Sequence, residues 1–276
     1  MNLPLRRSER VTFPGGTGAL LAGIVDLPAD SPRAMAVFAH CFTCSKDIKT
    51  TARIARALAG AGYSVLRFDF MGLGDSQGDF AGSSFSTNCA DLSAATRFAS
   101  QKYLEPSLLV GHSFGGAACL AVAGQLHSVM GVATIAAPSN THHLAALLER
   151  MNPSIAQVGR GQVTIGERSY TITREMLDNF RQFDMAHTLA QFTKPVLIFH
   201  APGDETLRFS HALRLLQALT RGSADRAESH HDSHSLASLI SLPGADHLLT
   251  NRSGDVEYVA AMTATWWQRL LETNPT

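Results

Sequence analysis

Residues 107–116 read Ser-Leu-Leu-Val-Gly-His-Ser-Phe-Gly-Gly, and this stretch decides the fold. Its apolar run at 108–110 has the length of a buried parallel strand, and the small residues of 117–123 predict a helix after it. Ser113 stands between the two, with one glycine two residues before it and another two residues after it. This glycine spacing in a sharp strand-to-helix turn is typical of a nucleophile elbow.

The glycines have a steric reason. A strained turn that exposes a serine hydroxyl brings strand and helix close together, so Gly111 and Gly115 leave space that a Cβ would fill. The helix that follows directs free N–H groups and the positive end of its dipole towards a developing oxyanion. We therefore predict that Ser113 is a catalytic nucleophile.

Composition limits the class of protein. The chain has 276 residues, of which 45% are hydrophobic and 17% charged, so it can bury the core of one α/β domain. Lys+Arg and Asp+Glu number 23 each, which does not favour a nucleic-acid partner. No apolar run approaches the roughly 18 residues of a membrane helix, and no secretory signal is visible. Four cysteines are too few for a disulfide framework in a chain this long. We expect a single domain, 1–276, in a cytoplasmic enzyme without a membrane partner.

Strands and helices alternate along most of the chain. Predicted strands lie at 10–13, 19–27, 34–39, 63–68, 108–110, 132–136, 195–200 and 236–242. Predicted helices begin near 48, 87, 117, 209 and 256, and the polar tract 221–235 predicts a flexible connection. The first two strands predict an antiparallel pair at the edge of the sheet. The strands and helices that alternate after them predict an α/β fold with a mostly parallel central sheet of about eight strands and helices on both faces.

The alternation stops between about 138 and 193. This segment predicts a helix near 142–151, a hairpin of 162–165 with 169–172, and a helix near 174–183 with Thr173 as its N-cap. We expect a small cap insertion over the active-site edge of the sheet. A surface insertion without a role in the site stays open as the alternative.

Two later loops carry the partners that a serine nucleophile needs. Asp204 follows the predicted strand at 195–200, and His247 follows the predicted strand at 236–242. Loops at the carboxyl ends of parallel strands meet at one edge of the sheet, and the order Ser113, Asp204, His247 is that of an α/β-hydrolase triad. His247 would take the Ser113 proton, and Asp204 would hold the imidazole and stabilise its charged form.

The oxyanion of such a reaction needs two N–H donors. One is the backbone of Phe114, directly after the serine, and the other is expected from the loop after the third strand, at Phe42. Losing one such donor typically raises the barrier by about 3–4 kcal/mol. Met71, Phe180 and Phe183 are candidates for the lining of an acyl pocket.

With these residues in place, the chain resembles the serine α/β-hydrolases over nearly its whole length. More narrowly, it resembles a bacterial esterase-like group with His-Cys-Phe-Thr-Cys-Ser-Lys-Asp at 40–47, Phe-Asp-Phe-Met-Gly-Leu-Gly at 68–74 and Gly-Ala-Asp-His-Leu-Leu-Thr at 244–250. The group is related to the hydrolase half of fusions with domains similar to osmotically induced peroxidases, and this chain looks like a stand-alone hydrolase. The resemblance implies a carboxylesterase for small or short-acyl esters, without a cofactor or metal; a homodimer stays open.

Other functions share parts of these motifs. A thioesterase, an acyltransferase and a peptidase would all form the same acyl-enzyme. Cys41 and Cys44 have the spacing of a thiol redox pair, and with His40 they could begin a zinc site, although a fourth ligand is not evident. A non-catalytic binding module on a hydrolase scaffold is the alternative outside enzyme function.

Several further polar residues are weaker candidates. His112 is expected to point away from Ser113, and His200 is expected to be structural. The remaining candidates are surface or capping histidines and alternative acids: His142, His143, His230, His231, His234, Asp184, Asp225 and Asp232.

Overall fold

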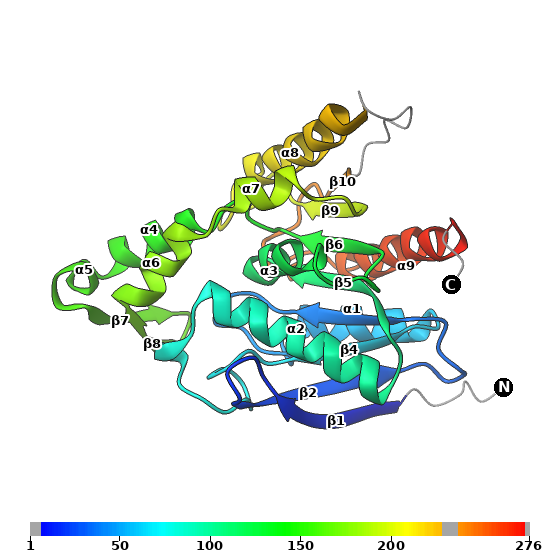
Figure 1. The fold of residues 1–276 in the computed structure, drawn as a ribbon, viewed down its shortest axis with the longest axis horizontal. Helices are drawn as coiled ribbons and strands as arrows, with labels where there is room; N and C mark the ends of the chain where they lie inside the picture. Colours follow the sequence, from blue (N-terminus) through cyan, green and yellow to red (C-terminus); the bar gives the residue numbers. More distant parts are fainter. Residues whose placement is uncertain (1–6, 228–236, 274–276) are drawn as a thin grey trace.

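An eight-stranded sheet forms the centre of the computed structural model, which describes residues 7–227 and 237–273 (Figure 1). Its strands run across the sheet in the order β1 (Arg7–Pro14), β2 (Leu20–Leu27), β4 (Ser64–Phe68), β3 (Met35–Ala39), β5 (Pro106–His112), β6 (Gly131–Ile135), β9 (Val196–His200) and β10 (Ala237–Ser241). β2 pairs antiparallel with both β1 and β4, and every other neighbouring pair is parallel. The predicted fold class is confirmed.

Helices cover both faces of this sheet. α1 (Lys49–Gly60) and α9 (Asp255–Thr273) pack together on one face, whereas α2 (Phe85–Lys102), α3 (Phe114–Ala123) and α8 (Ser210–Ala227) belong to the other. Successive side chains of a strand point to opposite faces. In β3, for example, Val37 joins the core under α2 and α3, and Phe38 joins the core under α1 and α9. Burial on both faces explains why the central strands appear in the sequence as continuous apolar runs.

The segment 138–193 forms an insertion between β6 and β9. It contains α4 (His142–Met151), α5 (Ser154–Val158), the hairpin of β7 (Arg160–Ile165) and β8 (Arg168–Thr173), α6 (Arg174–Gln182) and α7 (Met185–Ala190). The Thr173 side chain accepts the Met176 N–H at 3.2 Å, which confirms the predicted N-cap of α6. The short helices α5 and α7 were not predicted, because five or six residues are too few to show a helical period.

The insertion contacts the loops that follow β3, β4 and β5. The Tyr170 hydroxyl on β8 donates to the Thr43 carbonyl at 3.1 Å, and the Phe180 ring on α6 packs against Phe114. Figure 1 shows α4, α5, α6 and the hairpin together at the left of the molecule, while α7 lies against α8. The insertion therefore lies at the edge of the sheet where the strands β3 and β5 end.

One predicted connection is partly helical. The tract 221–235 was expected to be flexible, but α8 continues to Ala227. Ala224, Arg226 and Ala227 are good helix formers, so the helix extends through a polar stretch. The histidines at 230, 231 and 234 and Asp232 lie outside the described residues, as does the side chain of Asp225.

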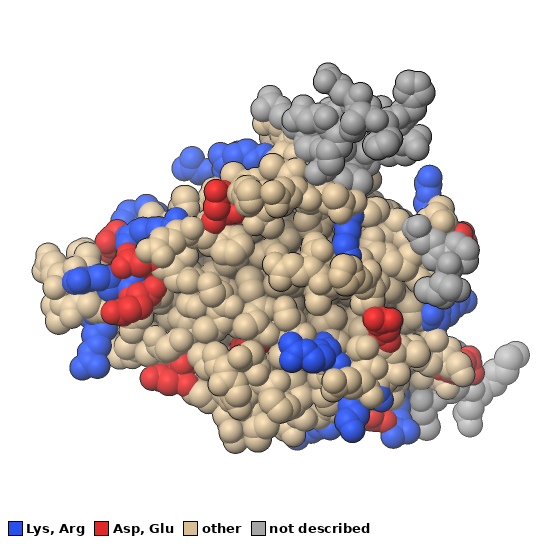
Figure 2. Space-filling model, viewed as in Figure 1, with Lys and Arg blue, Asp and Glu red and all other residues tan. Residues whose placement is uncertain are grey.

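The surface shows no concentration of one charge on the face in view. Figure 2 shows Lys and Arg interspersed with Asp and Glu, most densely over the insertion, around a broad uncharged centre. In the described part of the chain, none of the helices combines the length and apolarity that crossing a membrane requires.

Candidate active site

Ser113 lies in a strained turn between β5 and α3. Its φ of 53° and ψ of −121° are unusual for a residue with a side chain. A Cβ at Gly111 would lie 2.5 Å from the Gly116 Cα, and a Cβ at Gly115 would lie 2.3 Å from the Ala39 carbonyl oxygen. Both glycines are therefore required by the close approach of α3 to the sheet, as the sequence predicted.

The three residues proposed from separate loops meet at this turn. The Ser113 Oγ lies 3.0 Å from the His247 Nε2, and the His247 Nδ1 lies 2.7 Å from the Asp204 Oδ2. The other carboxylate oxygen of Asp204 accepts the backbone N–H groups of Thr206 and Leu207 at 2.9 and 2.8 Å. The carboxylate is fully buried, whereas the His247 side chain is 11% exposed. A hydroxyl, an imidazole and a carboxylate thus form one continuous chain of hydrogen bonds.

The surroundings keep Asp204 ionised. Burial raises the pKa of this carboxyl, but the hydrogen bond and charge of His247 and the Leu207 N–H outweigh burial, so the pKa falls below its usual value. His200 lies beside it, with its Nε2 3.6 Å from the Asp204 Oδ2 and 2.8 Å from the Leu207 carbonyl oxygen, to which it donates. Burial lowers the pKa of His200, so its ring is neutral, and its hydrogen bond to Leu207 gives it a structural role.

His112 connects the serine turn to the histidine loop. Its Nε2 lies 2.8 Å from the backbone carbonyl oxygen of His247. Burial, with the charge of His247 as a smaller cause, lowers the pKa of His112 to about 3. The ring is therefore neutral at ordinary pH, and its Nε2 must carry the proton that this hydrogen bond needs. The His112 side chain therefore bonds to the backbone of the loop that carries His247.

Phe42 and Phe114 provide two backbone N–H groups near the serine. In the described part of the chain neither N–H has a hydrogen-bond partner, and Phe114 is the first residue of α3. Their rings pack edge to face at 5.7 Å between centroids. Unpaired donors at a helix N-terminus and in the adjacent loop are the groups that stabilise an oxyanion.

A disulfide bond, which the sequence did not predict, joins Cys41 to Cys44 on either side of Phe42. Because both sulfurs are in this bond, neither is a thiolate that could bind zinc, which argues against the zinc-site alternative. A disulfide is also the oxidised form of the thiol redox pair that the sequence left open, while Cys89 and Cys119 are free. Disulfides in cytosolic proteins are rare and usually transient or catalytic, and the cytoplasmic location stays a prediction.

The predicted pocket residues fall into two groups. The Phe180 ring packs against Phe42 and Phe114, with centroids 6.0 and 5.0 Å apart, and Phe183 packs against Phe85 at 4.5 Å. Met71 has different contacts. Its sulfur accepts the Thr17 hydroxyl at 3.1 Å, and its backbone N–H donates to Asp91 at 3.0 Å. The two phenylalanines therefore lie near the donors, while the contacts of Met71 run towards the β1–β2 turn.

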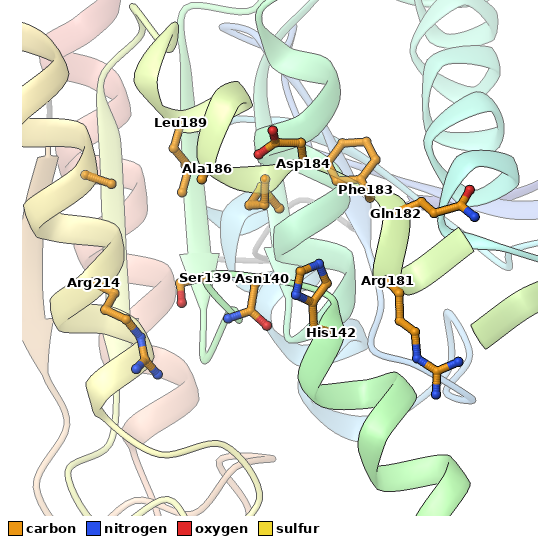
Figure 3. A pocket seen from close by; sticks show the side chains of 12 residues that line it. Ser139, Asn140, His142, Arg181, Gln182, Phe183, Asp184, Ala186, Leu189 and Arg214 are labelled. Carbon is orange, nitrogen blue, oxygen red and sulfur yellow. The ribbon is translucent and has the colours of Figure 1, made fainter. Parts of the chain in front are cut away.

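A cavity of about 570 Å³ lies beside this aromatic group, between the insertion and α8. Figure 3 shows Phe183 and Asp184 on one side of it, Ser139, Asn140 and His142 opposite, and Arg214 on α8. Ser113 is not among its lining residues. Asp184, an alternative acid in the sequence, accepts the His187 N–H at 2.9 Å and caps α7.

The structure pairs His143, which the sequence analysis treated as a surface or capping residue, with His211, which it did not single out. The rings of His143 and His211 lie 5.1 Å apart, and the His211 Nδ1 accepts the Ser139 N–H at 3.1 Å. Burial lowers the pKa of both, that of His211 to about 4, so they are neutral. His211 is the second residue of α8, and no motif in the surrounding sequence marks it, whereas His142 on α4 is exposed as expected.

Comparisons with known proteins identify the family of the chain. The model of the family described as serine aminopeptidase, S33, matches residues 30–159. The esterase domain of a Rhodothermus marinus protein is 38% identical, with 95% of this chain and 98% of that chain covered and a TM-score of 0.72. No curated protein matches the chain.

Two solved structures share the fold at lower identity. Est1E from Butyrivibrio proteoclasticus, solved with ferulic acid bound, is 16% identical, with 95% and 99% of the two chains covered and a TM-score of 0.77. An α/β serine hydrolase without a lid from Xanthomonas campestris is 20% identical, with 95% of each chain covered and a TM-score of 0.65. The chain belongs to the α/β-hydrolase superfamily.

Proposed function

We propose that this hydrolase cleaves carboxylic esters through an acyl-enzyme on Ser113. The observation that carries the proposal is the hydrogen-bonded chain from the Ser113 hydroxyl through His247 to the buried carboxylate of Asp204. A serine hydroxyl is a weak nucleophile, and an imidazole at 3.0 Å can remove its proton during attack.

Acylation begins when the Ser113 Oγ attacks the ester carbonyl and His247 accepts the hydroxyl proton at Nε2. Asp204 stabilises the imidazolium through Nδ1–H, and the tetrahedral oxyanion accepts hydrogen bonds from the N–H groups of Phe42 and Phe114. Collapse of this intermediate breaks the ester C–O bond, and His247 gives its proton to the leaving alcohol.

Deacylation repeats these steps with water. His247 takes a proton from water as its oxygen attacks the acyl carbonyl, and the oxyanion is held by the same two donors. Breaking the bond to the Ser113 Oγ releases the carboxylic acid, and His247 returns the proton to the serine. We expect the reaction to need no metal or cofactor.

Aromatic packing near the donors favours small acyl groups. The Phe180 ring is almost fully buried against Phe42 and Phe114, so little space is left beside the two N–H groups for a long chain. The name of the Rhodothermus marinus relative, an esterase domain, supports an ester as the substrate.

Peptide hydrolysis is the second candidate, because the matching family is described as serine aminopeptidase. A thioesterase or an acyltransferase would use the same acyl-enzyme. The identity of 38% to an esterase domain over nearly the whole chain favours the ester over these alternatives.

Turnover of p-nitrophenyl acetate, butyrate and octanoate tests the proposal, with leucine p-nitroanilide as the peptidase substrate. We expect ester turnover that decreases with chain length, is unaffected by EDTA and is abolished by Ser113→Ala. Ser93→Ala is the matched control, because that hydroxyl bonds only within α2. Wild-type rates in Ser113→Ala, or cleavage of the anilide in preference to every ester, would contradict the proposal.

A further inference from the structure

The loop that carries the Phe42 N–H is held at both ends. We call residues 40–46 the oxyanion loop. At its start, His40 donates from Nδ1 to the Cys41 carbonyl at 2.8 Å and accepts the Phe70 N–H at Nε2 at 3.3 Å. Burial lowers the pKa of His40, so its ring is neutral and can make both bonds at once.

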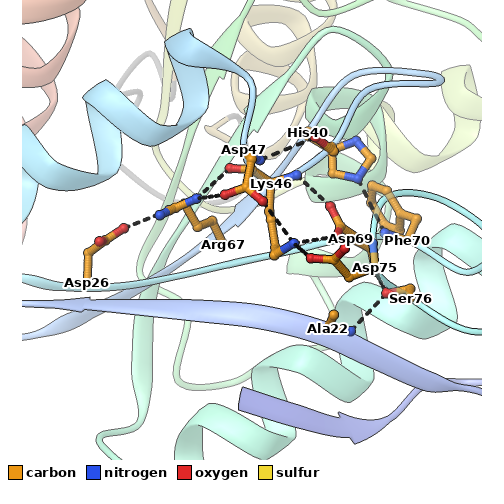
Figure 4. A network of polar contacts seen from close by, with 11 residues as sticks. Ala22, Asp26, His40, Lys46, Asp47, Arg67, Asp69, Phe70, Asp75 and Ser76 are labelled. Carbon is orange, nitrogen blue, oxygen red and sulfur yellow. Dashed lines mark hydrogen bonds and ion pairs between the residues drawn. The ribbon is translucent and has the colours of Figure 1, made fainter. Parts of the chain in front are cut away.

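Lys46 holds the other end of the loop. Its backbone N–H donates to the Asp69 Oδ1 at 2.6 Å, and its ammonium donates to the Asp69 Oδ2 at 2.8 Å (Figure 4). A second carboxylate, that of Asp75, accepts from the same ammonium at 2.6 Å. Burial lowers the pKa of Lys46, but the hydrogen bonds to these carboxylates outweigh burial and raise it, so the side chain is charged.

The carboxylate of Asp69 is enclosed by donors. It accepts from Lys46 twice and from the Asp75 N–H at 2.9 Å, and it is fully buried. A Cβ at Gly74 would lie 2.1 Å from it, so only glycine leaves room for the carboxylate here. Asp69 thus ties the end of the oxyanion loop to the turn after β4.

A second ion pair supports the same point from the sheet. The Arg67 guanidinium on β4 donates to the buried Asp26 at 2.7 Å and to the Lys46 carbonyl at 2.8 Å. Figure 4 shows Asp26, Arg67, Lys46 and Asp69 as one connected network between the strands and the loop. Both the N–H and the carbonyl of Lys46 are therefore fixed by buried charged side chains.

Burying charges is costly, and buried ion pairs often add little to stability. This network fixes the position of one backbone segment. Accurate positioning explains the network better than stability does, because an oxyanion donor must lie about 2.7–3.1 Å from the oxygen it stabilises. Phe42 is four residues from Lys46 and two from His40, in the part of the loop between the two attachments.

On the basis of the ester hydrolysis proposed above, we propose that Lys46 and Asp69 are positioning residues that aim the Phe42 N–H at the oxyanion. They do not touch the substrate. Their loss should raise the barrier to reaction while leaving binding of the ground-state ester nearly unchanged.

The test compares Lys46→Met, which removes the charge and keeps the stem, with Asp75→Asn as the matched control. Asp75 shares the ammonium but is 75% exposed and accepts no hydrogen bond from the loop backbone. With p-nitrophenyl butyrate, Lys46→Met should lower kcat by about 10–100-fold and change KM by no more than about threefold. This fall in kcat is less than or similar to the fall caused by the loss of one oxyanion donor. Asp75→Asn should keep kcat within about twofold.

Inhibition by phenylboronic acid separates positioning from a general loss of structure, because its tetrahedral adduct with serine resembles the intermediate. The inhibition constant should rise in parallel with the fall in kcat. If Lys46→Met does not fold, Asp69→Asn decides, since the amide has the shape of the carboxylate and should change both quantities in the same direction. Wild-type kcat and wild-type boronic acid inhibition in either folded variant would overturn the proposal. An inactive wild-type chain would instead contradict the proposed function.

Discussion

Replacement of His112 by glutamine should make the stability of the protein less dependent on pH. The buried imidazole has a pKa of about 3, against an ordinary value of 6.5. Below pH 6.5 the unfolded chain therefore binds a proton at this residue that the folded chain does not. The free energy of unfolding consequently falls as the pH drops from 6.5 towards 3, and the full contribution is present above 6.5.

The size of this effect follows from the two pKa values. One extra proton in the unfolded state gives a slope of about 1.4 kcal/mol per pH unit, or about 3 kcal/mol between pH 7 and pH 4. Other buried histidines with lowered pKa values, such as His200 and His211, add to the total slope of the wild type. The difference between wild type and His112→Gln isolates the contribution of one residue. Glutamine can still donate to the His247 carbonyl from its side-chain amide.

The assay is urea unfolding at pH 7, 6, 5 and 4, followed by circular dichroism. The wild type should lose about 3 kcal/mol more than His112→Gln across this range. His127→Gln is the control for the substitution itself, because His127 is exposed and its replacement should leave the free energy of unfolding at pH 7 nearly as in the wild type. Equal slopes for wild type and His112→Gln would refute the reasoning, since they would mean that the ring at 112 takes up its proton without unfolding.

Three further changes test the site. Asp204→Asn should lower ester turnover by about 10⁴-fold, because the amide favours the wrong tautomer of the histidine it contacts; a loss under tenfold would remove Asp204 from the mechanism. Gly115→Ala should destabilise the protein by about 1–3 kcal/mol, because its Cβ would meet the Ala39 carbonyl oxygen at 2.3 Å; unchanged urea unfolding would show that α3 can shift without cost. Cys41→Ser with Cys44→Ser should cost less than the roughly 10²-fold that losing an oxyanion donor costs, because the loop stays held at both ends; complete loss of turnover in a folded variant would favour thiol chemistry.

Much of the fold was predictable because its signals are local. A buried parallel strand must be apolar on both faces, so each central strand appears as a short continuous run of apolar residues. The elbow also has a clear local signal in the sequence, because Gly111 and Gly115 on either side of Ser113 have no space for a Cβ. Asp204 and His247 could be placed because each lies in the loop after a predicted strand, in the chain order of the superfamily.

Features that depend on the folded arrangement of side chains were not predictable from the sequence. Lys46 and Asp69 look like ordinary surface charges, because lysine and aspartate are rarely buried. Their pairing joins residues 23 positions apart, and only the fold brings them together. The Cys41–Cys44 bond has a spacing that equally fits free thiols or metal ligands, so sequence alone could not decide among them.

The hydrogen bond between Ser113 and His247 spans 134 residues of the chain. During synthesis the elbow can form once β3, β5 and β6 have emerged, whereas its base follows β10 and emerges 134 residues after the serine. A nascent or truncated chain that lacks β10 therefore has the serine turn without the group that activates it. Ester turnover thus reports that the far edge of the sheet has assembled, and its time course during refolding measures the last long-range step of folding.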